Sequence, residues 1–272
     1  MNNATARPSE GELTSDSVLS RFGLTGQVAV VTGGGDGIGR AAALHLASAG
    51  AMVCVIDLQA EKAQSVAAEI IDRGGMASAF VADVTDEAGM KSIFDEIETR
   101  FGGVDVLVNN AGLAIRSAAF DMTLDDWNRV LAVNLTGMFV AARLAAGVMA
   151  TSQKGGAIVN TASIMGLSGG LYPNAAYQTT KGGVVNMTRA LALEWASLKI
   201  RVNAVAPTFV RTAFIEPLLK DQEKMATIVA ATPLGRIAEP EEVADAILFL
   251  SSPAAAMITG TILPVDGGYL AR

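Results

Sequence analysis

Short apolar runs alternate with longer amphipathic stretches along most of the chain. Apolar, largely β-branched runs predict buried strands, and apolar residues spaced three or four positions apart predict helices. The predicted strands are residues 28–31, 53–56, 79–82, 104–108, 157–159, 200–205 and 261–265. The predicted helices are residues 38–48, 60–73, 87–100, 124–150, 177–197 and 241–250.

Strands that are apolar throughout and separated by helices indicate a parallel sheet covered on both faces. The sequence therefore predicts an α/β, three-layer, doubly wound fold with a seven-stranded parallel sheet flanked by helices. No linker divides the pattern, so residues 23–272 are predicted to form a single domain. Residues 1–22 are rich in Asn, Ser, Thr, Glu and Gly, and they are predicted to be a mobile N-terminal tail.

Composition narrows the class of protein. The chain has 272 residues, of which 51% are hydrophobic and 17% charged, as in a globular protein with a large core. Its net charge of −7 argues against nucleic acid or an anionic membrane as a partner. The single Cys54 and single His45 cannot form an internal disulfide or a His/Cys metal site, so no metal is expected. No apolar run of membrane-spanning length and no signal peptide is found, so a cytoplasmic protein is expected.

A glycine-rich segment joins the first predicted strand to the first predicted helix. Residues 32–39 read Thr-Gly-Gly-Gly-Asp-Gly-Ile-Gly. Glycines at this place let the backbone turn tightly and approach a pyrophosphate, which the helix amides and the positive end of the helix then hold. A plain tight turn is the alternative, and the position between strand and helix favours nucleotide binding.

Asp57 closes the second predicted strand, 18 residues after the last glycine of the glycine-rich segment, close to where an acid binds the adenosine ribose. A carboxylate there accepts from the 2′-hydroxyl and repels a 2′-phosphate. Asp36 adds a second negative charge, and Leu58 supplies no cation. The pattern predicts NAD rather than NADP; the alternative is that Asp57 only caps the next helix.

Tyr177 and Lys181 are four residues apart, so on a helix they share one face. A neighbouring cation favours the phenolate and lowers a tyrosine pKa from its usual value near 10, which suits proton transfer. The spacing alone equally fits one buried ring beside a solvated charge. Further motifs decide between these interpretations.

The motifs form an ordered set along the chain. They are the glycine-rich segment, Asp83-Val84, Asn109-Asn110-Ala111-Gly112, Asn134, Ser163, Tyr177 with Lys181, residues 200–207, Pro233-Leu234-Gly235-Arg236 and Asp266-Gly267-Gly268. From about residue 26 to 268 this set resembles the short-chain dehydrogenase/reductase family. The resemblance implies a Rossmann fold and an oxidoreductase that transfers hydride between NAD(H) and a secondary alcohol or ketone.

The resemblance also implies the roles of the site residues. Tyr177 would be the general acid/base, and Ser163 would hold the substrate oxygen. Lys181 would lower the pKa of Tyr177 and bind the nicotinamide ribose, and Asn134 would anchor a water leading to solvent. The implied cofactor-binding residues are Thr32, Gly33, Gly35, Asp36, Gly37, Ile38, Gly39, Asp57, Leu58, Asp83, Val84, Asn110, Ala111, Gly112, Tyr177, Lys181, Pro207, Val210 and Thr212.

The substrate end is predicted to be largely apolar. Residues 211–231 correspond to the family's substrate-specificity lobe. A largely apolar substrate site fits a polyol, a sugar-like or a cyclic alcohol as the substrate. It leaves open the alternative that the protein is a 3-oxoacyl-(acyl carrier protein) reductase. A non-catalytic NAD-binding sensor or scaffold is the alternative of another class. The predicted substrate contacts are Ile164, Met165, Tyr172, Phe209 and Phe214, with Arg116, Asn174 and Arg211 as polar candidates.

Three further expectations concern structure and assembly. Asn109 is expected to tie adjacent strands together. Pro207-Thr208 stands where the family usually has Pro-Gly, and a β-branched residue there restricts the backbone beside the nicotinamide. The resemblance implies a homo-oligomer, most often a tetramer, built through the helix at 124–150, the helix of Tyr177 and the last strand.

Overall fold

The computed structural model describes residues 18–272, so residues 1–17 of the predicted tail lie outside the described part. The rest of that segment forms a 3-10 helix, η1 (Val18–Phe22), and the mobility of the tail stays a prediction. The ring of Phe22 lies 6.2 Å from the ring of Phe249. Leu24, two residues after Phe22, is fully buried, so apolar side chains hold this segment against the fold.

Seven parallel strands form one sheet in the order β3-β2-β1-β4-β5-β6-β7, which confirms the predicted fold class. The order changes direction between β1 and β4, and in such sheets the ligand site lies at the carboxyl ends of the strands around this point. The strands are β1 (Val28–Thr32), β2 (Met52–Asp57), β3 (Met76–Val81), β4 (Val106–Asn109), β5 (Gly156–Thr161), β6 (Ile200–Pro207) and β7 (Ile262–Val265).

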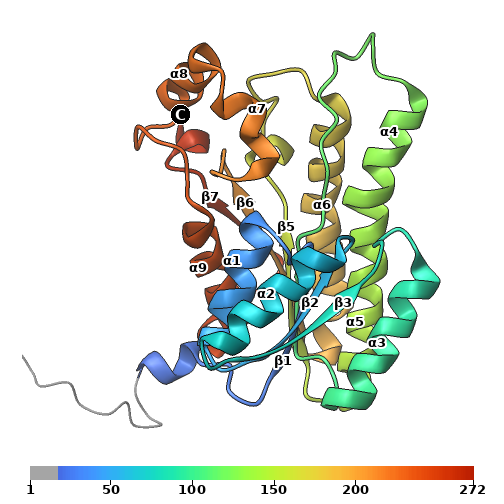
Figure 1. The fold of residues 1–272 in the computed structure, drawn as a ribbon. Helices are drawn as coiled ribbons and strands as arrows, with labels where there is room; N and C mark the ends of the chain where they lie inside the picture. The colour runs from blue at the N-terminus through green and yellow to red at the C-terminus, as the bar shows by residue number, and fades with distance from the viewer. Residues whose placement is uncertain (1–17) are drawn as a thin grey trace, which may run out of the picture.

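Helices cover both faces of the sheet (Figure 1). The first layer is α1 (Gly37–Ser48), α2 (Ala60–Asp72) and α9 (Pro240–Ser251); the second is α3 (Glu87–Phe101), α5 (Met138–Ser152) and α6 (Ala175–Glu194). Alternate residues of β1 pack against the two helix layers, because successive side chains of a strand point to opposite faces of the sheet. Ala29 and Val31 pack in the first core, and Val28 and Val30 in the second.

The predicted long helix is interrupted. The chain runs through α4 (Leu124–Leu131), a π-helical turn η2 (Ala132–Gly137) and then α5. By length and composition alone Leu124–Ser152 could cross a membrane, although polar residues such as Asn134 and Arg143 interrupt its apolar residues. Half of its most apolar window is buried inside the protein, so we interpret it as a core helix. The π turn gives this stretch a local irregularity at Asn134, and such turns are frequent at functional sites.

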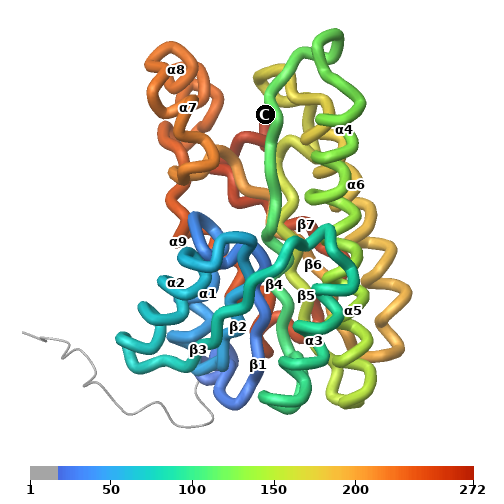
Figure 2. The backbone as a smooth tube through the Cα atoms, turned by 45° about the vertical axis from the view of Figure 1, so that its right-hand side comes forward, coloured from blue at the N-terminus to red at the C-terminus, as the bar shows by residue number. Residues whose placement is uncertain are grey.

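A small lobe follows β6 beyond the carboxyl end of the sheet. It contains η5 (Ala213–Ile215), α7 (Glu216–Leu219) and α8 (Gln222–Ala231). Figure 2 shows α7 and α8 on one side above the strands, opposite α4 and α6. The lobe has a small apolar core of its own: Ile164, Phe209, Ile215, Leu218, Ile228 and Ile237.

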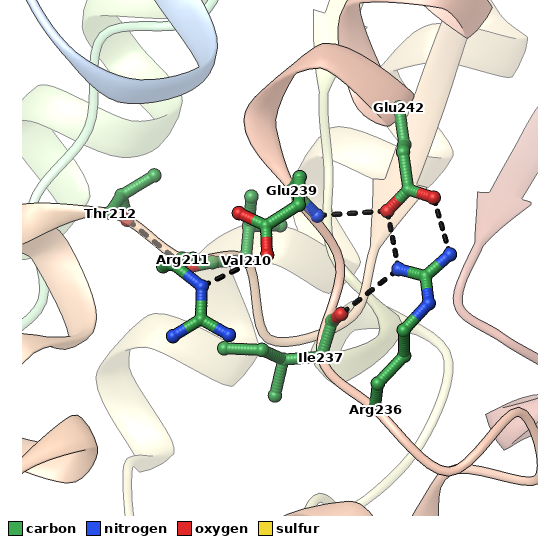
Figure 3. A network of polar contacts seen from close by, with 7 residues as sticks. All are labelled: Val210, Arg211, Thr212, Arg236, Ile237, Glu239 and Glu242. Atoms are coloured by element: carbon green, nitrogen blue, oxygen red, sulfur yellow. Dashed lines mark hydrogen bonds and ion pairs between the residues drawn. The ribbon is translucent and has the colours of Figure 1, made fainter.

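The base of the lobe is fixed to the start of α9 by polar contacts (Figure 3). Arg211 N donates to Ala238 O at 2.9 Å, and Arg211 Nε donates to Glu239 Oε1 at 2.9 Å. Arg236 forms a two-point ion pair with Glu242, and the Glu242 carboxylate also accepts from Glu239 N at 2.9 Å. These bonds set the path of the chain where it enters the lobe.

Candidate active site

One cavity of about 720 Å³ opens at the carboxyl end of the sheet and extends from the glycine-rich segment to the lobe. Its size is within the usual range of ligand sites. All five predicted substrate contacts line it, and so do Ser163, Tyr177 and Lys181. The predicted cofactor residues also line it, with the exceptions of Thr32, Gly35 and Gly39, and Asn134 lies behind the wall.

The glycine-rich segment leaves no room for side chains. Gly33 and Gly37 have φ values of +60° and +51°, which other residues rarely adopt. A Cβ on Gly39 would lie 2.0 Å from Gly33 O, and one on Gly37 would lie 3.0 Å from Thr212 Cγ2. Gly39 therefore serves close packing beneath the segment, while Gly33 and Gly37 line the cavity.

Thr32 and Asn110 hold the segment in place. The buried Thr32 Oγ1 accepts from Asn110 N at 3.1 Å and from Ala111 N at 3.2 Å. Asn110 Nδ2 donates to Gly33 O at 3.1 Å, and Thr161 Oγ1 donates to Asn110 Oδ1 at 3.2 Å. The side chains of Thr32 and Asn110 thus tie together the ends of β1, β4 and β5.

Asn109 is a structural residue, as expected. It is 1% exposed, and its Nδ2 donates to Met138 O at 2.6 Å. Thr32 Oγ1 donates to Asn109 Oδ1 at 3.4 Å. The side chain therefore links β4 to β1 and to the start of α5.

The ribose end carries a cation that the sequence analysis missed. Lys62 Nζ lies 2.9 Å from Asp36 Oδ2, and this bond holds the pKa of Asp36 below its usual value. Asp36 Oδ1 also accepts from Gly37 N at 2.7 Å as the cap of α1. Leu58 supplies no cation, but the first turn of α2 brings Lys62 to Asp36 of the glycine-rich segment. The signal available in the sequence was a lysine in the first turn of the helix that follows β2.

Both carboxylate oxygens of Asp57 accept hydrogen bonds from backbone N–H groups. Its Oδ2 accepts from Gly35 N and its Oδ1 from Gln59 N, both at 3.0 Å. Each carboxylate oxygen has a further lone pair that can accept from a hydroxyl. Asp57 therefore fixes the glycine-rich segment and can also bind a ribose.

Ser163, Tyr177 and Lys181 come together on one wall of the cavity. Ser163 caps η3 (Ile164–Gly166) after β5, its Oγ accepts from Met165 N at 3.1 Å, and its hydroxyl hydrogen-bonds Tyr177. Lys181 lies one turn after Tyr177 on α6, and its Nζ is 5.5 Å from the centre of the Tyr177 ring. Lys181 is 3% exposed and donates to Thr161 O at 2.6 Å.

Burial shifts the pKa values of Tyr177 and Lys181 in opposite directions. Burial raises the pKa of Tyr177, while the Ser163 hydrogen bond and the Arg116 charge act in the opposite direction. Burial lowers the pKa of Lys181 to about 7. A lysine with this pKa is partly neutral near pH 7, and the lowering of the Tyr177 pKa by Lys181 stays a prediction.

Asn134 connects the π turn to the wall of the site. Its Oδ1 accepts from Leu113 N at 2.8 Å, and its Nδ2 donates to Leu113 O at 2.8 Å and to Thr180 Oγ1 at 3.3 Å. Both amide hydrogens are in use, so a water could reach the side chain only at Oδ1. The role of Asn134 in anchoring a water stays a prediction.

The substrate end is mainly apolar but includes free polar atoms. The side chains of Ile164, Phe209 and Phe214 line it. Within residues 18–272, Asn174 Oδ1 and Thr208 Oγ1 are buried without a hydrogen-bond partner, and both residues line the cavity. Both atoms are covered by protein, so other atoms of Asn174 and Thr208 face the open space of the cavity.

Two expectations about this end are resolved by the structure. Arg211 is paired with Glu239 and does not line the cavity, so it is removed from the polar candidates (Figure 3). Thr208 has no positive φ, and its N donates to Val265 O at 3.1 Å. The chain therefore follows the strand without needing glycine at this position.

Comparison with known proteins agrees with this geometry. The family model described as enoyl-(acyl carrier protein) reductase matches residues 23–270. A D-threitol dehydrogenase of Mycolicibacterium smegmatis is 40% identical over 253 residues, covering 93% of this chain and 96% of the relative. A cis-4-hydroxycyclohexanecarboxylate dehydrogenase of Sinomonas cyclohexanicum is 44% identical over 246 residues, covering 90% and 97%.

A solved structure shares the whole fold. It is a gluconate 5-dehydrogenase from Burkholderia cenocepacia in complex with NADP and tartrate, with a TM-score of 0.90 and 35% identity. The alignment covers 94% of this chain and 100% of that chain. Gly33 and Gly37 have no side chains to block a ligand from the backbone, and the carboxylate of Asp57 stands at the end of β2. Both features fit a dinucleotide bound at the same end of the sheet. The chain belongs to the short-chain dehydrogenase/reductase family, and it is an oxidoreductase acting on a CH–OH group or the corresponding ketone.

Proposed function

We propose that the protein is a cytoplasmic, NAD-dependent dehydrogenase that oxidises a secondary alcohol of a polyol, a sugar-like molecule or a cyclic alcohol. One observation carries the proposal. Ser163, Tyr177 and Lys181 share a wall of the cavity that begins at the glycine-rich segment. A sensor or scaffold would need the nucleotide site but has no need of a proton-transfer group beside it.

The residues of this wall have distinct tasks in the proposed reaction. A bound nicotinamide cofactor supplies the hydride chemistry. Ser163 donates a hydrogen bond to the substrate oxygen, and the phenolic oxygen of Tyr177 accepts the hydroxyl proton during oxidation. Lys181, held by Thr161 O, stays within 5.5 Å of the Tyr177 ring centre and favours the phenolate when it is protonated.

The preference for NAD rests on the charges at the ribose end. Asp57 and Asp36 place two carboxylates there, and both oppose a 2′-phosphate. Lys62 is the one cation beside them in the described cavity wall, and Asp36 already holds it. We infer that NAD binds more tightly than NADP. Kd values for NADH and NADPH test this directly.

The function is tested by a screen of NAD⁺ and NADP⁺ reduction over polyols, aldonates, cyclic alcohols and hydroxyacyl compounds. Turnover with NAD⁺ supports the proposal. Tight NADH binding without turnover of any compound would favour the sensor instead.

A second candidate is a 3-oxoacyl-(acyl carrier protein) reductase. This function is favoured by apolar side chains of the cavity wall, which suit an acyl chain: Ile164, Phe209, Phe214, Ile215 and Leu218. Faster reduction of a 3-oxoacyl thioester than oxidation of any polyol or cyclic alcohol would establish this alternative.

We also propose that the protein is a homo-oligomer, most simply a tetramer. Leu124 on α4 is 78% exposed and Leu193 on α6 is 82% exposed, and these two helices contact each other. Large exposed apolar side chains on neighbouring helices indicate a covered surface. Light scattering should give a multiple of the 28.0 kDa chain mass, and Leu193→Glu should lower it.

A further inference from the structure

Arg116 reaches the proposed reaction centre through Phe214. It lies in the segment between β4 and α4, which in Figure 1 rises beside the lobe before α4 begins. Its Nη2 donates to Phe214 O at 3.2 Å, and its guanidinium carbon lies 5.6 Å from the Phe214 ring centre. The same ring lies 6.0 Å from the ring of Tyr177. Phe214 thus adjoins both the guanidinium and the proton-transfer residue.

The guanidinium of Arg116 has no anionic partner in the described part of the chain. No carboxylate of residues 18–272 forms an ion pair with it, whereas Arg211 and Arg236 are both paired. The acidic residues lining the cavity follow β1, β2 and β3, at the adenosine end. One of the five N–H groups of Arg116 donates to Phe214 O, which leaves the others available for an anion.

Two further polar atoms without a protein partner lie in the same cavity wall. Asn174 precedes Tyr177 by one helical turn, and its buried Oδ1 lacks a donor within the described residues. Thr208 Oγ1, directly after β6, is also buried and has no hydrogen-bond partner within the described residues. Neither atom is accessible from the cavity, whereas the guanidinium of Arg116 is available to a ligand at this end, and its planar shape suits a carboxylate.

We propose that Arg116 binds a carboxylate of the substrate, so that the enzyme acts on hydroxy acids and the corresponding oxo acids. The inference rests on the proposed dehydrogenase function and names its substrate class. In oxidation the carbon–hydrogen bond breaks with transfer of hydride to NAD⁺, the hydroxyl proton passes to Tyr177, and a carbonyl forms. The carboxylate is unchanged throughout, because its task is to place the hydroxyl near Ser163 and Tyr177.

The test compares two substrates of similar shape, of which one has a carboxylate and the other has a neutral group in its place. One pair is 4-hydroxycyclohexanecarboxylate and its methyl ester, and another is an aldonate with its alditol. Wild-type protein should prefer the carboxylate in kcat/KM, and Arg116→Gln should lower the ratio of carboxylate to neutral substrate about 100-fold, since hydrogen bonds to charged groups are worth this much. Arg116→Lys should recover part of the ratio. Arg189→Gln, on the exposed side of α6, is the matched control and should not change it.

Three outcomes would overturn the inference. The first is a higher kcat/KM of the wild type for the neutral substrate, and the second is an equal fall of kcat/KM for both substrates in Arg116→Gln. The third is that Arg129→Gln, and not Arg116→Gln, removes the preference for the carboxylate, since Arg129 is the other arginine of the cavity wall. An equal fall would assign Arg116 to the shape of the site or to the titration of Tyr177.

A binding measurement separates this inference from the dehydrogenase proposal. Cyclohexanecarboxylate and cyclohexanecarboxamide have no hydroxyl to oxidise, and their affinity for the NADH-loaded protein can be measured by calorimetry. Tighter binding of the carboxylate, lost in Arg116→Gln, supports the inference even where no alcohol is turned over. Equal affinity of the acid and the amide would contradict it while leaving the dehydrogenase function intact.

Discussion

Lys181 Nζ donates a hydrogen bond of 2.6 Å to the carbonyl oxygen of Thr161, linking α6 to the end of β5. The ammonium is 3% exposed, and burial lowers its pKa to about 7. The bond fixes the nitrogen beside the Tyr177 ring. The same burial makes the charge on this nitrogen sensitive to pH near neutrality.

The first prediction concerns stability and pH. The folded-state pKa of Lys181 lies below its unfolded value, so between about pH 7 and about pH 10 the unfolded chain binds more protons and stability rises with pH. From about pH 7 to about pH 9 the wild type should gain about 2 kcal/mol of unfolding free energy relative to Lys181→Met. Urea unfolding of both proteins at each pH measures this. A difference that stays constant over this range would contradict the lowered pKa.

Tyr177→Phe should abolish turnover while leaving NADH affinity within about twofold. The phenylalanine ring keeps the shape of the wall but has no oxygen to exchange a proton. Steady-state kinetics and NADH fluorescence titration measure the two effects. Tyr269→Phe, a tyrosine outside the cavity wall, is the control and should retain both properties. Undiminished turnover in Tyr177→Phe would remove the proposed role.

Asp57 and Lys62 should act in opposite directions on cofactor choice. Asp57→Ala removes the carboxylate that repels a 2′-phosphate, so the ratio of NADPH Kd to NADH Kd should fall by about tenfold. Lys62→Met removes the cation, so the ratio should rise. Titration of each protein with both cofactors gives these ratios, and Asp72→Ala at the end of α2 is the control. A wild type that binds NADPH as tightly as NADH would contradict the preference.

Asn134→Ala should destabilise the fold and lower activity together. Its removal leaves the buried N–H and C=O groups of Leu113 without partners, which should cost about 2–4 kcal/mol. Thermal unfolding and kcat on the same preparation test this. Asn128→Ala, exposed on α4, should change neither. A stable but inactive Asn134→Ala would favour a role in proton exchange over positioning.

Local sequence pattern predicted much of the fold and part of the site. The seven strands could be found because buried parallel strands are apolar along their whole length, and the glycine-rich segment because its backbone path excludes side chains. The π turn at Ala132–Gly137 could not be found, since its sequence has the same apolar helical pattern as its neighbours. The 3-10 helix at Val18–Phe22 could not be found either. The ring contact that accompanies it, between Phe22 and Phe249, joins positions far apart in the chain, and a local pattern does not reveal such a contact.

The sequence by itself determined the order of the strands along the chain and the spacing of Tyr177 and Lys181 on one helix face, because both follow from local periodicity. Only the tertiary structure decided which charges meet. It placed Lys62 on Asp36 and paired Arg211 with Glu239, and it left Arg116 beside Phe214 without a carboxylate partner among residues 18–272. Burial likewise set the pKa of Lys181 near 7, since desolvation depends on the packing around a group rather than on its neighbours in the chain.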